Sequence, residues 1–140
     1  MGQLRAFAKL ITSLHGVDVD FAIVYIAEAH PTDGWMYPAV EQFAYRKQHT
    51  QLEDRMVAAR VLRAKLRETE LAALSAVAGG VPVPVFADAM NDAASLAFGA
   101  LPERLAIVLD GQVRFIGGKG PEDYSMDQAA AALRALVTRL

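Results

Sequence analysis

The sequence predicts an α/β domain that ends in an antiparallel hairpin. Helical apolar spacing alternates along the chain with short runs of β-branched and other apolar residues, a pattern typical of helices that cover a sheet. Residues 104–109 and 112–116 are two such runs. The Asp110-Gly111 pair between them is a strong hairpin signal, because both central residues of this turn need positive φ. The predicted order is α-β-α-β-α-β-β-α.

In the first part of the chain, residues 3–15 predict an amphipathic helix and residues 19–26 a strand buried on both faces. No residue that could cap a helix precedes Leu4, which indicates that the chain begins inside an element of structure. Residues 28–48 contain prolines and an Asp-Gly pair and predict a long loop. Loops of this length are often functional.

A capping box at Thr50–Glu53 opens the next predicted helix, which continues to Gly79-Gly80. It is either one long helix or two helices joined near residues 67–69. In a capping box the first side chain bonds a backbone N–H of the first turn, and the acidic side chain bonds back to the cap. The sequence therefore assigns Glu53 a role at the start of this helix.

Residues 81–88 predict a second strand, and two prolines place it at a sheet edge or confine its pairing to one end. A short helix follows over 91–98, with Asn91 or Asp92 as its N-cap. A second capping box, at residues 125–128, opens the last helix.

Size and composition limit the kinds of protein that this chain can be. It has 140 residues, of which 54% are hydrophobic, and a formal net charge of −2, so we expect one domain over residues 1–140 and no nucleic-acid partner. No apolar run approaches the ~18 residues of a membrane span, and no secretory signal is evident, so we expect a cytoplasmic protein. Cysteine is absent, which excludes disulfides and a cysteine nucleophile within these residues.

Glu28 and His30 follow the first strand and form the first candidate site. Residues i and i+2 of an extended segment face the same side, so this carboxylate and imidazole can share a cleft and act as a general acid or base. A solvated loop pair is the alternative that spacing alone favours. His49 and Glu53 have the spacing of metal ligands on a helix. Glu53 is better explained by capping, so we expect no metal site.

Three further features can be explained either by a role in ligand binding or by local structure. Residues 117–121, with Lys119, can bind an anion through backbone N–H groups or form a simple turn before the last helix. Trp35 can be a binding platform or a packed side chain. Pro102, just before a strand, is a candidate for a cis peptide bond.

Together these segments resemble the iodothyronine deiodinases. Residues 19–35, VDFAIVYIAEAHPTDGW, are similar to the family's strand and its Glu-Ala-His-Pro-Ser-Asp-Gly-Trp signature. Residues 48–62, QHTQLEDRMVAARVL, are similar to the family's Gln-His and Leu-Glu-Asp-Arg helix. Residues 88–124 are similar to its C-terminal half. The resemblance runs from about Leu4 to Leu136, with two poorly matched internal stretches.

The resemblance implies a thioredoxin-like fold of the peroxiredoxin-like branch. It implies the reductive removal of iodide from an iodinated phenol such as thyroxine by a selenocysteine nucleophile, which a thiol cosubstrate regenerates without any other cofactor. Selenolate suits this reaction because the deprotonated chalcogen is the nucleophile, and a selenol ionises below neutral pH. A homodimer is possible.

The family's site residues can be assigned by position. Glu28 and His30 match the family's Glu and His near the nucleophile, where His30 would bind the substrate phenol or relay protons. His49 matches a second histidine, in a proton path. These three are the expected catalytic residues.

The expected substrate-binding residues lie in the second half of the chain. Pro102 stands where thioredoxin-like folds place a cis-proline, followed by the family's Glu103 and Arg104. Lys119 stands where the family often has arginine and could pair with the substrate's carboxylate. Lysine keeps the charge but loses the bidentate fork.

The sequence departs from the family at its start. In the family, a strand and a Cys-x-x-selenocysteine stretch come immediately before the segment matched by residues 1–4. We expect that the chain begins just after the nucleophile, because the UGA codon of selenocysteine is easily read as a stop. The missing strand would lie mid-sheet, between residues 20–26 and 104–109. The alternative is a thioredoxin-like binding module without redox activity. A thiol peroxidase is disfavoured because the Glu-Ala-His and Leu-Glu-Asp-Arg blocks are not markers of that group.

Overall fold

The structure is a computed structural model that describes residue 10 and residues 19–34, 46–68 and 83–138. Most of the helix predicted over 3–15, the Trp35 site and the helical continuation after residue 68 therefore lie outside the described residues.

The described elements follow the predicted order. They are, in sequence, β1 (Ile23–Tyr25), α2 (Leu52–Glu68), β2 (Val85–Ala87), α4 (Ala93–Phe98), β3 (Ala106–Leu109), β4 (Gln112–Ile116) and α5 (Met126–Val137). The α/β class is confirmed. β1, β2 and β3 are shorter than the apolar runs that predicted them, whereas β4 has the predicted bounds. None of the helices in the described part of the chain is both long and apolar enough to cross a membrane.

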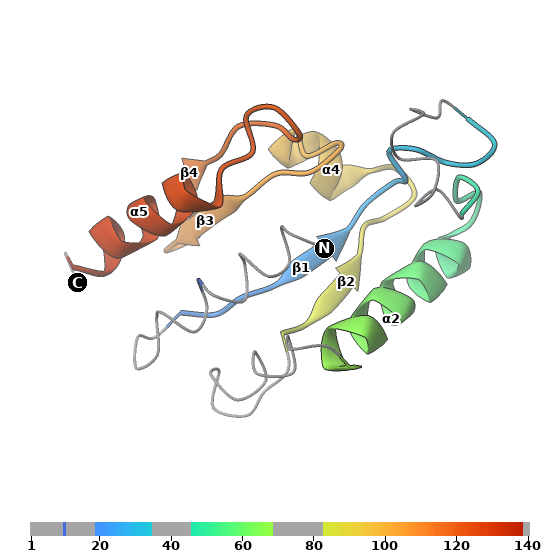
Figure 1. Ribbon diagram of the computed structural model, residues 1–140, viewed down its shortest axis with the longest axis horizontal. Helices are drawn as coiled ribbons and strands as arrows, with labels where there is room; N and C mark the ends of the chain where they lie inside the picture. The colour runs from blue at the N-terminus through green and yellow to red at the C-terminus, as the bar shows by residue number, and fades with distance from the viewer. Residues whose placement is uncertain (1–9, 11–18, 35–45, 69–82, 139–140) are drawn as a thin grey trace.

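The described strands form two separate two-stranded sheets (Figure 1). β1 and β2 pair in parallel, with Ile23 opposite Val85, and β1 is the one strand that β2 pairs with among the described residues, which is consistent with the edge position that its prolines predict. β3 and β4 pair as an antiparallel hairpin. The hairpin prediction is confirmed, because Asp110 and Gly111 have φ values of 53° and 71°.

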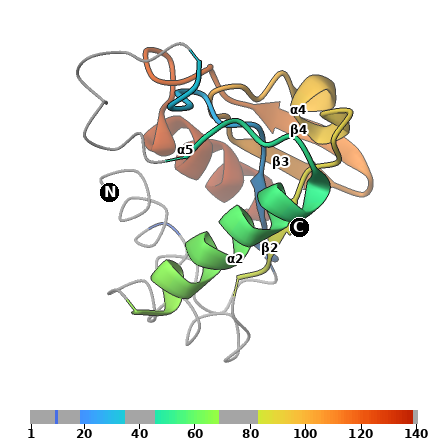
Figure 2. The same cartoon turned by 90° about the vertical axis from the view of Figure 1, so that its right-hand side faces the viewer.

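The helices lie on both sides of these strands. α2 packs against β1 and β2, whereas α5 packs against β3 and β4, and the two helices lie on opposite sides of the strands (Figures 1 and 2). Leu10, Ala130 and Leu133 form a buried cluster on the α5 side. Phe21 and Ile107 pack against this cluster, so it joins the start of β1 to β3.

At the start of α2, the acidic residue that completes the helix cap is not the predicted one. Glu53 does not serve as the reciprocal partner of Thr50, because its carboxylate pairs with Arg60 at 2.9 Å. Asp54 takes its place and accepts from the Thr50 hydroxyl at 3.4 Å and from the Gln51 backbone N–H at 3.2 Å. A carboxylate one residue further along still reaches the first turn. At α5, Ser125 accepts from the Gln128 N–H at 3.2 Å, as predicted.

The start of α4 is capped by a residue that the sequence did not indicate. Asp92 stands at the N-cap position with φ 54°, but it makes no side-chain cap hydrogen bond. The buried carboxylate of Asp88 instead accepts the N–H groups of Ala94 and Ser95, at 2.9 and 2.8 Å, and that of Ala89 at 2.9 Å. Asp92 is held by Arg55, 2.9 Å away.

Asp88 should make stability depend on pH. Burial alone raises the pKa of this carboxyl, but its three backbone donors and Arg55 outweigh burial and hold the pKa below the ordinary 3.8. A lowered pKa in the folded state means stability that is present above about pH 4 and lost as the pH falls through the folded-state value. We expect Asp88→Asn to cost about 3 kcal/mol at pH 7.

Urea unfolding from pH 7 to pH 2 checks this prediction. The difference between wild type and Asp88→Asn should shrink as acid protonates Asp88 in the wild type. Asp20→Asn, which removes an exposed carboxylate, should stay near wild type throughout. A difference that does not change with pH would show that the charge on Asp88 is unimportant.

Candidate functional site

Three side chains meet just past the carboxyl end of β1. The Tyr25 hydroxyl donates a hydrogen bond to Oε1 of Glu28, and His49 Nε2 lies 3.6 Å from the same oxygen. The rings of Tyr25 and His49 are 5.8 Å apart between centroids. β1 positions Tyr25, the loop after it supplies Glu28, and His49 comes from the segment that leads into α2. We call these residues the Tyr25–Glu28–His49 cluster.

Burial sets the protonation state of His49, which is only 8% exposed. Burial lowers the pKa of His49 below the ordinary 6.5, since it outweighs the opposing effect of the Glu28 carboxylate; Arg55 also lowers it. Asp54 and Arg46 act more weakly and in opposite directions. The imidazole is therefore neutral at pH 7 and can accept a proton. Glu28, beside it, is placed to stabilise the imidazolium that forms.

The loop that carries Glu28 is fastened to the segment before α2. The Gln48 side chain bonds both backbone groups of Glu28, accepting from its N–H at 3.1 Å and donating to its carbonyl at 2.9 Å. The Gln48 N–H donates to the Asp33 carboxylate at 2.8 Å, and the Thr32 N–H donates to the Arg46 carbonyl at 2.7 Å. The described ends of the predicted 28–48 loop thus lie together.

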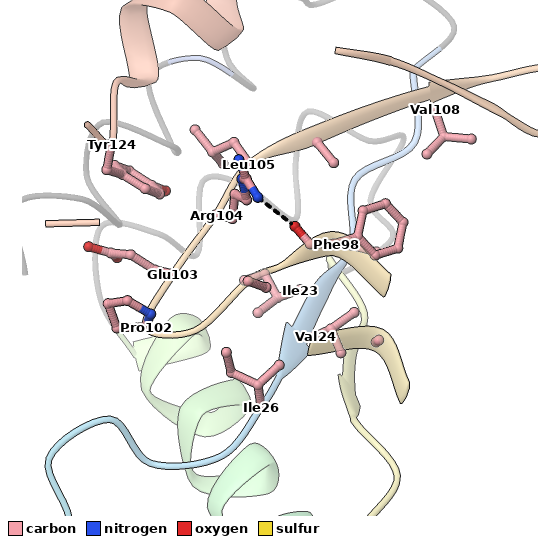
Figure 3. Close-up of a pocket in the computed structure, with 14 residues that line it drawn as sticks. Ile23, Val24, Ile26, Phe98, Pro102, Glu103, Arg104, Leu105, Val108 and Tyr124 are labelled. Atoms are coloured by element: carbon pink, nitrogen blue, oxygen red, sulfur yellow. Dashed lines mark hydrogen bonds between the residues drawn. The ribbon is translucent and has the colours of Figure 1, made fainter. Parts of the chain in front are cut away.

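Predicted substrate-binding residues line a cleft of about 440 Å³ between β1 and the segment that leads into β3 (Figure 3). Side chains of Ile23, Val24 and Ile26 form one wall. The other wall is residues 102–106, which include Pro102, Glu103 and Arg104, together with Val108. The Leu101–Pro102 peptide bond is cis, as its position suggested.

Arg104 and Tyr124 are two of the polar side chains that line this cleft. Arg104 donates to the carbonyls of Gly117, at 2.7 Å, and Phe98, at 3.0 Å, so it ties the end of α4 to the end of β4 (Figure 3 shows the Phe98 bond). Burial, and then the charge of Glu103, raise the pKa of Tyr124 to about 12, so this phenol stays protonated. Because its guanidinium is bonded to the Gly117 and Phe98 carbonyls, Arg104 shapes the cleft rather than offering a free cation.

A second cavity, of about 490 Å³, lies on the α5 side and is lined by residues 19–22, which precede β1, by β3, and by side chains of α5. The first cavity is lined by residues 22–26 and 102–106, and the second by residues 19–22 and 104–109. β1 and β3 therefore run in opposite directions along a shared gap, as the arrows in Figure 1 also show. β1 and β3 are not hydrogen-bonded to each other and belong to different sheets. We call the two cavities together the β1–β3 slot.

The predicted site residues thus fall into groups. Glu28 and His49 are in contact distance, and Pro102, Glu103 and Arg104 share the cleft. His30 is half-buried two residues after Glu28, and its role stays a prediction. Lys119 is in the turn after β4 and does not line the cleft; its stem lies near Gly99, as does Arg104.

Two residues of the site were missed from the sequence. Tyr25 reads as one more apolar residue of a buried strand, although a phenol three residues before a glutamate was a usable signal. Gln48 reads as a polar loop residue, and nothing in its local spacing indicates a contact across 20 positions.

Comparison with known proteins agrees with the resemblance seen in the motifs. The model of the family described as iodothyronine deiodinase matches residues 1–137. Thyroxine 5-deiodinase of Ovis aries is 38% identical over 128 residues, which are 91% of this chain and 38% of that protein. Thyroxine 5-deiodinase of Gallus gallus is 36% identical over 142 residues, 100% of this chain and 48% of that protein. Type II iodothyronine deiodinase of Gallus gallus is 37% identical over 127 residues, 90% of this chain and 41% of that protein. The chain spans less than half the length of these relatives.

Proposed function

This chain belongs to the iodothyronine deiodinase family, and on that premise we propose that the protein removes iodide reductively from an iodothyronine. Overall, a ring C–I bond becomes C–H, iodide and a proton are released, and two thiols become a disulfide. A small iodinated phenol and a thiol reductant are the partners that this reaction requires. The Tyr25–Glu28–His49 cluster is the observation that carries the proposal, because it offers a buried proton acceptor where such a reaction needs one.

We also propose that the fold is completed as a thioredoxin-like sheet by one strand in the β1–β3 slot. Two facts support this: among the described residues β1 and β3 each pair on one edge, and both cavities of the slot are lined mainly by apolar residues. A strand in the slot would be parallel to one neighbour and antiparallel to the other. It would end near Glu28 and could place a selenocysteine there, whose selenolate would supply the nucleophile for iodine.

Each residue of the cluster then has a part in proton movement. Neutral His49 takes or relays a proton, Glu28 stabilises the charged imidazole, and the Tyr25 hydroxyl holds the Glu28 carboxylate in place. His30, half-buried on the same loop, binds the phenol or continues the proton path. Lys119 attracts the carboxylate at the other end of the substrate.

Iodide release from thyroxine by the full-length protein, with a dithiol as reductant, tests this proposal. We expect Glu28→Gln to lower kcat about 100-fold or more, because positioned acid–base catalysis contributes on that scale. Glu53→Gln is the matched control, since Glu53 is an exposed surface carboxylate paired with Arg60. It should keep wild-type activity.

The alternative function, a redox-inactive binding module, predicts a different result. In that case the full-length protein binds an iodothyronine but releases no iodide, whatever residue stands at position 28. Equal activity of wild type and Glu28→Gln would contradict the role of the cluster even if iodide is released.

A further inference from the structure

Gln48 links the backbones of the two residues whose side chains form the Glu28–His49 pair. Its Oε1 accepts the N–H of Glu28 at 3.1 Å and the N–H of His49 at 3.2 Å. Its Nε2 donates to the Glu28 carbonyl at 2.9 Å. One amide thus pairs with Glu28 as a neighbouring strand would, although 20 positions separate the two residues.

Loop closure alone does not explain these contacts. The Thr32 N–H to Arg46 carbonyl bond and the Gln48 N–H to Asp33 bond already join the two ends of the loop. The side-chain amide adds something different: it fixes where the main chain of Glu28 lies relative to that of His49. Because both side chains leave these fixed points, the amide sets the backbone separation from which the Glu28 carboxylate, held by the Tyr25 hydroxyl, reaches the imidazole.

We propose that Gln48 is a positioning residue that holds Glu28 against His49. This inference deepens the proposed function, on which its importance for catalysis rests, but the positioning itself can be measured without any activity. The charged groups that act on His49 are Glu28, Arg55, Asp54 and Arg46, with the Tyr25 phenol beside its ring. Among these groups, Glu28 is the one whose backbone N–H and carbonyl are both bonded by the Gln48 side chain.

A double-mutant cycle on the full-length protein, read by NMR titration of the His49 ring, tests the inference. His49→Gln identifies the His49 signal. With Gln48 present, Glu28→Gln should lower the His49 pKa by about one unit, because it removes a close opposite charge. In a Gln48→Met background, which keeps length but removes the amide, the same change should lower the pKa by about a third of that or less, because Glu28 is already released.

Gln51→Met is the matched control, because Gln51 is an exposed glutamine three positions further along the chain. In that background the full effect of Glu28→Gln should return. If Gln48→Met fails to fold, Gln48→Asn replaces it: the amide remains but is one carbon too short to bond both backbone groups of Glu28. A Glu28→Gln shift that stays undiminished in the Gln48→Met background, or in the Gln48→Asn background where that variant replaces it, overturns the inference.

The catalytic consequence is measured separately. Gln48→Met should lower kcat about ten-fold with little change in KM, because it disturbs proton movement and not substrate binding. If the protein releases no iodide but the titration cycle behaves as expected, the proposed function fails and the positioning role stands. If iodide is released and the cycle shows no coupling, the positioning role fails alone.

Discussion

The 140-residue chain by itself should release no iodide from an iodothyronine, even with excess dithiol. It contains no cysteine, and no other side chain in it can attack iodine and be regenerated by a thiol. The role that we propose for Tyr25, Glu28 and His49 is proton movement, which cannot replace the nucleophile. The measurement is iodide release at a substrate concentration that saturates the relatives, with heat-denatured chain as the blank.

A positive result would be informative only if it came from the chain itself. Iodide release by the purified chain, abolished by His30→Ala, would contradict the account, because it would place the whole reaction within these residues. Release that His30→Ala leaves unchanged would come from a contaminant. We expect neither.

A strand supplied to the β1–β3 slot should raise the melting temperature by roughly 10 °C or more. Hydrogen bonds contribute about 1 kcal/mol each, and a strand of five residues can make several on both sides, while 1 kcal/mol shifts the midpoint by roughly 4 °C. The edges it would cover are apolar: Val24 is 44% exposed and Val108 is 53% exposed. Without it, we expect the chain to be poorly folded or to associate through these edges.

The strand can be added as an N-terminal fusion and followed by thermal unfolding and light scattering. A fusion of equal composition with two prolines in the strand is the control, because proline removes the donors that pairing needs. It should leave the melting temperature and the association unchanged. Cooperative unfolding of the unmodified chain as a monomer above ~60 °C would contradict the open slot and favour the binding module.

The fold was predictable where a local pattern specifies local structure. Asp110-Gly111 forms the turn that its sequence predicts, and β2, directly after Pro84, pairs with β1 alone among the described strands. The caps were less predictable, because several acidic residues near a helix start compete for the same N–H groups. Asp88, four residues before the expected cap, prevails because it is buried and reaches Ala94 and Ser95.

The site was predictable from the resemblance and only in part from spacing. Spacing indicated His30 as the histidine beside Glu28, but the structure also places His49, 21 positions away, 3.6 Å from the Glu28 carboxylate. Such contacts depend on how the loop closes, which in turn depends on Gln48 and Asp33. No periodicity records those long-range bonds, so Gln48 and Tyr25 became visible only in three dimensions.

The most direct test of the central claim is iodide release by the chain fused to an upstream strand that ends in cysteine. The account predicts dithiol-dependent release that disappears when this cysteine becomes serine and falls about 100-fold with Glu28→Gln. It also predicts no loss with Glu53→Gln. A fusion that folds, gains stability from the strand and still releases no iodide would contradict the claim that the slot places a nucleophile beside Glu28 and His49.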